Sequence, residues 1–210
     1  MNDSDITSPP HFSSDSIISK YGLSDKIYRY LREILLYNEK INIVSRETSP
    51  DDLKSIAADS LVPFEFIPTP TGHLFDIGPG AGFPAIVVLM AFPDLRGLLI
   101  ERTQKKIEFL RNMLDMFGLD ADIIHADFAE AISRIDPASF DTGLMKLVRP
   151  DSKMIRHVLD ILKPAGWFVY YSDLDERSVK ILSDFKINKY KYFLDKSNRA
   201  RTITVLTKTG

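Results

Sequence analysis

The chain has no cysteine, no long apolar run and no excess of basic residues. Without cysteine it forms no disulfide, has no thiolate metal site and has no cysteine nucleophile, so its fold depends on packing. The longest uninterrupted apolar stretch, 85–92, is far shorter than the roughly 20 residues that a membrane-crossing helix needs. The amino terminus lacks the basic and apolar regions of a secretion signal. These absences predict a soluble cytoplasmic protein without membrane contact.

Charge is nearly balanced, because 27 Lys and Arg face 29 Asp and Glu. The chain as a whole therefore lacks the basic excess typical of nucleic-acid-binding proteins, and any contact with RNA must come from a local patch. The four histidines are scattered and none has metal-ligand spacing, so no metal site is predicted. At 210 residues, 44% of them hydrophobic, the chain can bury the core of one globular domain.

The texture of the sequence changes near residue 71. The first twenty residues are rich in Ser, Asp and Pro, and we interpret them as a mobile lead-in that a short helix ends. Apolar residues then recur at helical spacing from residue 27 to residue 41, and a second helix is predicted from about Asp51. We therefore predict a mobile N-terminus and helical cap over 1–70, followed by a core over 71–210, in one structural domain.

Beyond Gly72, short apolar strands alternate with helix-length segments, which is typical of a parallel α/β sheet. The predicted strands are 73–77, 97–100, 121–125, 140–145, 167–171, 189–194 and 201–207, the last two of them paired. The predicted helices are 84–91, 103–117, 152–162 and 175–185.

Segment 76–84, with the sequence DIGPGAGFP, joins the first predicted strand to a helix. Its glycines let the backbone come close to a ligand, and the helix start offers free N–H groups, which suits a nucleotide-like ligand. A nicotinamide fingerprint would need its third glycine at Phe83, so the dinucleotide reading is weak. A P-loop is excluded because no G-K-[ST] follows. No ATPase is implied.

Two further acids follow the next predicted strands. Glu101 comes 25 residues after Asp76, the distance expected for neighbouring strand ends across one helix. We therefore expect Glu101 beside the glycine-rich segment, where its carboxylate can accept both hydroxyls of a ribose. Asp127 follows the third strand and is placed to approach an adenine, with Phe128 as a flat neighbour. Three successive strand ends thus form a candidate adenosine site.

These residues resemble the class I S-adenosylmethionine-dependent methyltransferases, and within them the ribosomal RNA small-subunit methyltransferase G family, also called glucose-inhibited division protein B. Segments 37–45, 58–61, 76–84 and 105–111 carry the resemblance, which covers about residues 27–171. It implies a Rossmann-like α/β fold with a seven-strand, mostly parallel sheet, helices on both faces and a helical N-terminal cap. It also implies S-adenosylmethionine as cofactor and methylation of a guanine N7 in 16S ribosomal RNA.

The resemblance implies roles for individual residues. The predicted cofactor-binding residues are Asp76, Gly78, Pro79, Gly80, Gly82, Phe83, Glu101, Arg102, Asp127, Phe128 and Ala129. Lys146, in Met-Lys-Leu where the family has Ser-Arg-Ala, is predicted to be the catalytic residue on the acceptor side. Guanine N7 already carries a lone pair and loses no proton on methylation, so positioning does most of the work. The expected partner is 16S ribosomal RNA or the small ribosomal subunit, bound by a monomer.

The substrate half of the sequence departs from the family pattern. Ser55 and Ile56 stand where the family typically has Arg-His, and Ser172 falls near its lysine after the fifth strand. These departures leave open a divergent paralogue that methylates another RNA position or a small molecule, and a non-catalytic S-adenosylmethionine-binding module. A dehydrogenase would instead bind a nicotinamide cofactor.

Overall fold

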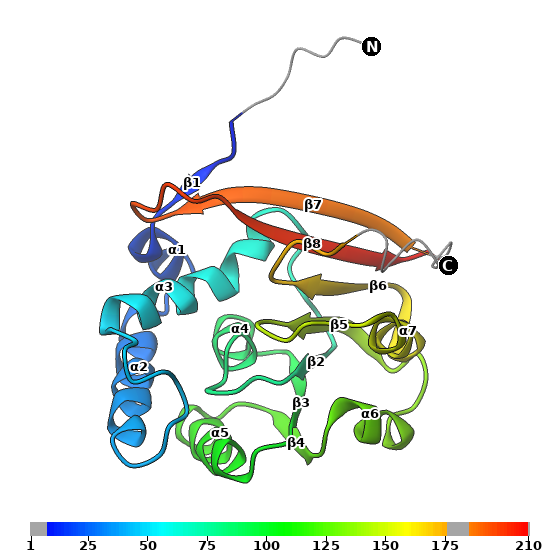
Figure 1. Ribbon diagram of the computed structural model, residues 1–210, viewed down its shortest axis with the longest axis horizontal. Coiled ribbons are helices and arrows are strands. Elements are labelled where there is room, and N and C mark those ends of the chain that lie inside the picture. The colour runs from blue at the N-terminus through cyan, green and yellow to red at the C-terminus, as the bar shows by residue number, and fades with distance from the viewer. Residues whose placement is uncertain (1–7, 176–184, 210) are drawn as a thin grey trace.

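In the computed structural model, which describes residues 8–175 and 185–209, the described strands form one eight-stranded sheet. They lie in the order β1-β7-β8-β6-β5-β2-β3-β4 (Figure 1). Their bounds are β1 His11–Phe12, β2 His73–Ile77, β3 Arg96–Glu101, β4 Ala121–His125, β5 Phe140–Met145, β6 Leu162–Tyr170, β7 Phe185–Leu194 and β8 Arg201–Lys208. Among these strands β8 is antiparallel to both its neighbours, and the other pairs are parallel. The predicted Rossmann-like fold is confirmed, but with eight strands instead of seven, because β1 adds to the β7 edge.

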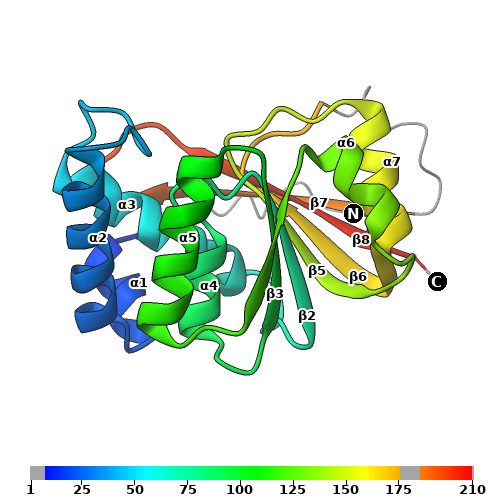
Figure 2. The same cartoon turned by 90° about the horizontal axis from the view of Figure 1, so that it is seen from below.

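Helices cover both faces of the sheet. They are α1 Ser14–Lys20, α2 Ser24–Asn38, α3 Pro50–Leu61, α4 Ala85–Ala91, α5 Gln104–Phe117, α6 Phe128–Ala131 and α7 Ser152–Ile161, with short 3-10 helices at Val62–Glu65 and Ile132–Arg134. Figure 2 shows α4 and α5 on one face, with α1, α2 and α3 beyond them, and α6 and α7 on the other face. We call α1, α2 and α3 the cap helices.

Successive side chains along each strand point to opposite faces of the sheet, and each face packs into its own hydrophobic core. In β5, Leu144 packs with the cap helices, α4 and α5, whereas Met145 packs with α6 and α7. Leu74 and Phe75 of β2 divide in the same way. A sheet that is covered on both faces requires apolar residues at both registers, which explains why its central strands are nearly continuous apolar runs.

The start of α3 follows from its sequence. Ser49 is the N-cap, and its Oγ accepts a hydrogen bond from the backbone N–H of Asp52 at 3.1 Å. The Asp52 carboxylate accepts in return from the Ser49 N–H at 2.9 Å, which completes a capping box. Pro50 occupies the first turn, where its missing N–H costs nothing. The predicted start near residue 51 is confirmed.

Residues 8–20 of the predicted lead-in contain the short helix expected at its end, α1, and a strand that was not expected, β1. His11 and Phe12 pair with Phe193 and Leu194 of β7. The Asp195 carboxylate accepts hydrogen bonds from the Ser14 N–H at 2.8 Å and from its hydroxyl at 2.7 Å. The partners that order this segment lie near the other end of the chain, so local composition could not indicate them.

Most predicted elements are confirmed, with a few different boundaries. The strands 73–77, 121–125 and 140–145 coincide with β2, β4 and β5. β6 begins at Leu162, ahead of the expected start at residue 167, because Leu162 pairs with Phe140 of β5. β7 begins at Phe185 and not at residue 189, because Phe185 pairs with Lys208 of β8. The helix predicted over 175–185 falls mostly on residues 176–184, outside the described residues.

The carboxyl ends of four parallel strands meet at one edge of the sheet. Ile77 of β2 lies opposite Ile100 of β3 on one side and opposite Met145 of β5 on the other. β3 in turn pairs with β4, where Glu101 lies opposite His125. β3 and then β4 are added on one side of β2, and the chain then crosses back so that β5 pairs with the other side of β2. A reversal of this kind opens a crevice outside the strand ends, where α/β proteins bind ligands.

Candidate functional site

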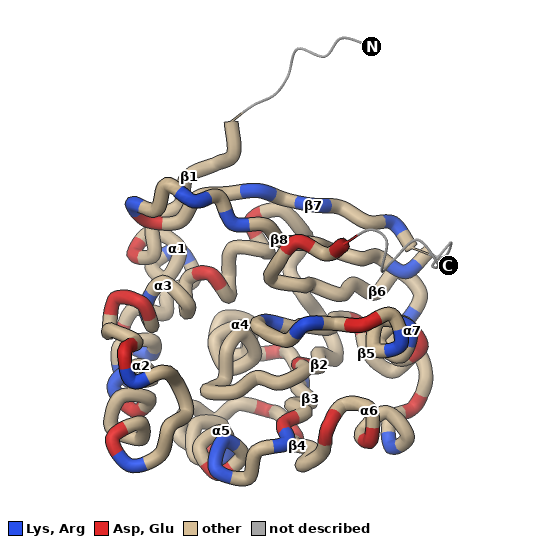
Figure 3. Tube along the Cα trace, in the orientation of Figure 1, with Lys and Arg blue, Asp and Glu red and all other residues tan. Residues whose placement is uncertain are grey.

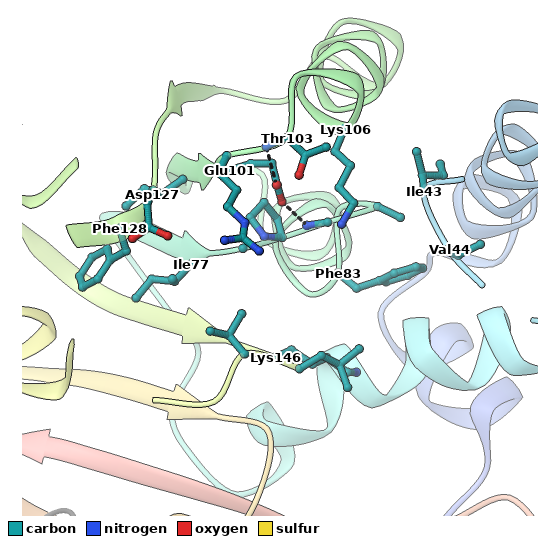
Figure 4. A pocket seen from close by; sticks show the side chains of 18 of the residues that line it. Ile43, Val44, Ile77, Phe83, Glu101, Thr103, Lys106, Asp127, Phe128 and Lys146 are labelled. Atoms are coloured by element: carbon teal, nitrogen blue, oxygen red, sulfur yellow. Dashed lines mark hydrogen bonds between the residues drawn. The ribbon is translucent and has the colours of Figure 1, made fainter. Parts of the chain in front are cut away.

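A cavity of about 630 Å³ lies at these strand ends. Five segments line it: the loop after α2, the turn between β2 and α4, and the segments at the ends of β3, β4 and β5. Ile56 of α3, Lys106 of α5 and Met154 of α7 complete the lining. Figure 4 shows side chains from all five segments around one space. The sequence-predicted residues on its wall are Gly78, Pro79, Gly80, Phe83, Glu101, Arg102, Asp127, Phe128 and Lys146.

The turn at 76–84, which we call the glycine turn, needs its three glycines for different reasons. Gly78, Gly80 and Gly82 all have positive φ. A Cβ at Gly78 would come within 2.9 Å of Val148 Cγ2, whereas one at Gly80 would find nothing closer than the Lys106 ammonium at 3.9 Å. Gly80 thus presents bare backbone to the cavity, as a close ligand requires.

Gly82 faces the protein interior. A Cβ there would lie 2.5 Å from both the Tyr30 hydroxyl and Ile86 Cγ1. Gly82 is absent from the cavity wall, although the resemblance implies that it binds the cofactor. Its neighbour Ala81 receives a hydrogen bond from the Tyr30 hydroxyl at its carbonyl oxygen, so α2 of the cap supports the glycine turn directly.

Glu101 lies beside the glycine turn, as its spacing from Asp76 predicts. One carboxylate oxygen accepts from the Gly80 N–H at 3.2 Å, and the other accepts from the Thr103 N–H at 2.9 Å (Figure 4). Its side chain is buried yet borders the cavity. Each carboxylate oxygen has a second lone pair, so both can still accept a hydroxyl from a ligand.

Asp127 and Phe128 border the cavity at the end of β4, and the predicted Ala129 does not line it. Asp127 is the N-cap of α6, and its Oδ1 accepts from the Ala129 N–H at 3.0 Å. Its carboxylate therefore has one oxygen free for another donor. Phe128 is buried with its ring in the α6 and α7 core.

Asp76 lies beneath the glycine turn and not on the cavity wall. It is fully buried, and its Oδ2 accepts from the Ala85 N–H at 3.0 Å. Its Oδ1 has no hydrogen-bond partner among the described residues. Burial, opposed by that hydrogen bond and by the charge of Lys146, raises the pKa of Asp76 to about 8.

The raised pKa makes stability depend on pH. The native state keeps a proton on Asp76 between about pH 4 and pH 8, while the unfolded chain releases it, so unfolding free energy falls as pH rises through this range. Asp76→Asn carries no charge at any pH and should remove this contribution, which has a slope of about 1.4 kcal/mol per pH unit. Urea unfolding of both proteins from pH 5 to pH 9 measures the difference. Parallel pH profiles would contradict it.

The ammonium of Lys146 turns toward α3. It donates to Asp59 Oδ2 at 2.6 Å and to the Ile56 carbonyl oxygen at 3.3 Å, while the stem of the side chain borders the cavity. It also lies 5.0 Å from the centre of the Tyr171 ring. The predicted catalytic cation is therefore already engaged inside the protein.

Asp59 is the centre of this buried cluster. Besides Lys146 it receives hydrogen bonds at Oδ1 from Arg201 Nη1 and from the Tyr192 hydroxyl, both at 2.6 Å. Burial would raise the pKa of Asp59, but the charges of Lys146 and Arg201 outweigh it and hold that pKa below its usual value. The cluster thus joins α3, β5, β7 and β8 by one ionised carboxylate.

The sequence prediction missed the loop after α2. Ile43, Val44, Ser45 and Thr48 line the cavity from the cap side. Asn38 fixes this loop, because its Oδ1 accepts from the N–H groups of Ile43 and Val44 at 2.9 and 3.1 Å. The family resemblance of segment 37–45 was the one signal that could have indicated this loop. Its apolar side chains did not indicate a ligand-binding role.

The described residues contain no metal-binding group and no membrane-spanning helix. Within residues 8–175 and 185–209, no group of three or more His, Asp or Glu side chains is arranged to hold a metal ion. Over the same residues, no helix has the length and apolar character to span a membrane.

Sequence comparison assigns the chain to a family. A family model described as "GidB: rRNA small subunit methyltransferase G" matches residues 23–207, nearly the whole chain. The chain belongs to this family. The residues that match include both the cap helices α2 and α3 and the strands that surround the cavity.

Curated relatives agree with membership of the methyltransferase G family. Ribosomal RNA small subunit methyltransferase G of Chlorobium luteolum is 31% identical over 144 residues, which cover 68% of this chain and 59% of that protein. The protein of that name from Trichodesmium erythraeum is 28% identical and aligns with 100% of this chain and 91% of its own length. The chain thus spans less than two thirds of the Chlorobium protein.

The fold is similar to that of solved methyltransferases. A putative O-methyltransferase from Klebsiella pneumoniae superposes with a TM-score of 0.64 at 13% sequence identity, over 94% of this chain and 96% of that one. At this identity the likeness concerns the fold alone. It supports the class I methyltransferase architecture that the resemblance implied.

The positions that depart from the methyltransferase G pattern lie in three places. Ser55 and Lys146 belong to the Asp59 cluster, because Ser55 Oγ accepts from Arg201 Nη2 at 3.1 Å. Ile56 lines the cavity. Ser172 does not, and its carbonyl oxygen accepts from Thr204 Oγ1 at 2.8 Å.

Proposed function

We propose that the protein is an S-adenosylmethionine-dependent methyltransferase that acts on guanine N7 in 16S ribosomal RNA. The observation that carries the proposal is the Glu101 carboxylate, held by two backbone N–H groups against the bare backbone of Gly80 on the wall of the cavity. Family membership supports the choice of RNA as acceptor. Because the proposed acceptor is ribosomal RNA, we also propose that the protein acts in the cytoplasm.

The residues of the cavity fit the cofactor. Glu101 keeps two lone pairs for the hydroxyls of a ribose, and Asp127 has a free carboxylate oxygen for an exocyclic amine. Ile77, Ile100 and Phe128 supply an apolar wall for a flat ring. When bound, S-adenosylmethionine supplies an electrophilic methyl group. The glycine turn, held by Tyr30, sets how closely the backbone approaches that ligand.

The acceptor chemistry explains why the cavity needs no free base. Guanine N7 attacks with an in-plane lone pair and releases no proton, so the protein has to orient the reactants and exclude water. Lys146 then acts as a positioning residue in place of the predicted catalytic role, because its ammonium is bound to Asp59. Val44, Ile56 and Phe83 provide apolar surface on the cap side of the cavity.

The function is tested by methyl transfer from labelled S-adenosylmethionine. The acceptors are small ribosomal subunits and naked 16S RNA from cells that lack this methylation, and the labelled base is mapped. Label on a single guanine N7 supports the proposal. Cofactor binding without label on RNA would assign the protein to another acceptor or to a binding role, and binding of a nicotinamide cofactor instead would indicate a dehydrogenase.

Glu101→Gln should weaken S-adenosylmethionine binding by about 10-fold to 100-fold. The amide NH₂ of the new glutamine would face the backbone N–H of Gly80 or of Thr103, so two donors would meet without an acceptor. The ribose would also lose a charged hydrogen-bond acceptor. Equilibrium dialysis measures the dissociation constant. Glu108→Gln is the matched control, since Glu108 is exposed on α5 and its carboxylate accepts from Gln104 Nε2. Equal affinities for the two variants would contradict the role of Glu101.

A further inference from the structure

Leu147 combines two unfavourable features at one residue. It is the second residue after β5 and is 92% exposed, the highest exposure of any large hydrophobic side chain among the described residues. Its φ is +61°, in the left-handed region that a leucine rarely adopts. Strained backbone at a non-glycine residue persists where the surroundings impose it, and such residues gather at functional sites.

The neighbours of Leu147 hold it in this position. Lys146 on one side is anchored to Asp59 inside the protein. Val148 on the other side packs against the glycine turn, so closely that a Cβ at Gly78 would come within 2.9 Å of it. Both neighbours are fixed by contacts that face inward, so the side chain of Leu147 is left exposed between them. It lines the cavity.

The surroundings of Leu147 indicate what it contacts. Apolar side chains of Val44 and Ile56 line the same cavity from the cap side, and Val148 and Met154 line it beside Leu147. An opening with apolar walls suits a flat aromatic ring that is transferred from water into the protein, such as a nucleic acid base that has been unstacked from its neighbours.

Cations surround the same opening. Arg102 and Lys106 line the cavity, and Arg149 and Lys153 are exposed on the stretch that runs from the end of β5 into the first turn of α7. Over the described part of the chain, none of these four side chains forms an ion pair with a carboxylate. Figure 3 shows Lys and Arg on this stretch and at the start of α5. Unpaired cations beside an apolar opening fit a ligand that joins a flat ring to phosphates.

We propose that Leu147 is a specificity-determining residue that packs against the face of the acceptor purine of RNA and holds it at the mouth of the cavity. This inference rests on the proposed function and deepens it, because it names the side chain that meets the base. The left-handed backbone conformation of Leu147 directs its side chain toward the substrate and away from the core, which explains why the strain is kept.

The test separates acceptor binding from cofactor binding and from folding. Leu147→Ala should lower kcat/KM for the RNA acceptor about tenfold or more, mainly through KM, and leave the dissociation constant of S-adenosylmethionine unchanged. Leu147→Met should keep most of the activity, because it restores apolar contact. Leu147→Gly should lose activity while its melting temperature rises, since glycine relieves the strain.

Leu36→Ala is the matched control, because Leu36 is an exposed leucine on α2 outside the cavity wall. It should leave kcat/KM unchanged. Unchanged kcat/KM for Leu147→Ala, or weaker cofactor binding by that variant, would overturn the inference while the proposed function stands. Absence of methyl transfer to RNA by the unaltered protein would overturn both.

Discussion

Replacing Asp59 by alanine should lower the free energy of unfolding by about 3 to 5 kcal/mol. The variant leaves the ammonium of Lys146 buried without its carboxylate partner, and removes the acceptor at which Arg201 and Tyr192 also donate. Breaking a buried ion pair from one side is costly because the remaining charge has no compensation. Urea unfolding at pH 7, monitored by far-UV circular dichroism, measures the loss.

Asp15→Ala is the control for this prediction. Asp15 pairs with Lys54 at 2.5 Å, but both side chains are accessible to water. Its removal should change stability by less than about 1 kcal/mol. The double variant Asp59→Ala, Lys146→Met should recover part of the loss, because the uncompensated ammonium is gone. If Asp59→Ala were no less stable than Asp15→Ala, the cluster would not contribute to folding as described.

Replacing Gly82 by alanine should also destabilise the protein strongly, by about 3 to 5 kcal/mol. The new Cβ meets the Tyr30 hydroxyl and Ile86 at 2.5 Å, and φ is +95° at this position. The clash would displace the glycine turn from α2, since Tyr30 also binds the Ala81 carbonyl oxygen. Thermal and urea unfolding report the loss directly.

Gly80→Ala provides the contrast, because it lies two residues away in the same turn. Its φ is also positive, but its Cβ would point into open space, so the expected loss of stability is only about 1 kcal/mol. Its effect should appear in cofactor affinity, where the bare backbone is needed. Tyr30→Phe combined with Gly82→Ala should restore part of the stability, because one of the two clashing groups is removed. Equal unfolding midpoints for Gly80→Ala and Gly82→Ala would contradict the separate roles of these glycines.

Local sequence patterns predict the strands that carry the site and the position of Glu101 beside the glycine turn. The strands β2, β4 and β5 are apolar runs bounded by turn residues, and their limits follow from the sequence. The position of Glu101 beside the glycine turn follows because one helix separates two neighbouring parallel strands. These features depend on residues that lie close together in the chain, so spacing alone carries the information.

Contacts between distant segments are what the sequence could not provide. Lys146 carries no local sign that its partner is Asp59, 87 residues earlier, and Arg201 lies 142 residues from that same carboxylate. The assignment of Lys146 as a cation on the acceptor side came from the family resemblance, and the fold turns its ammonium inward to Asp59. Gly82 shows the same limit, because only the packing of Tyr30 distinguishes it from Gly80.

The pairing of β1 with β7 has a consequence for how the protein is made. Ser14 binds Asp195, which lies 181 residues further along the chain, and His11 stacks on Phe193. During translation β1 leaves the ribosome long before β7 exists, so it stays unpaired until residues 193–195 have been synthesised. This pairing therefore forms late, and a nascent chain that stops before residue 185 lacks it.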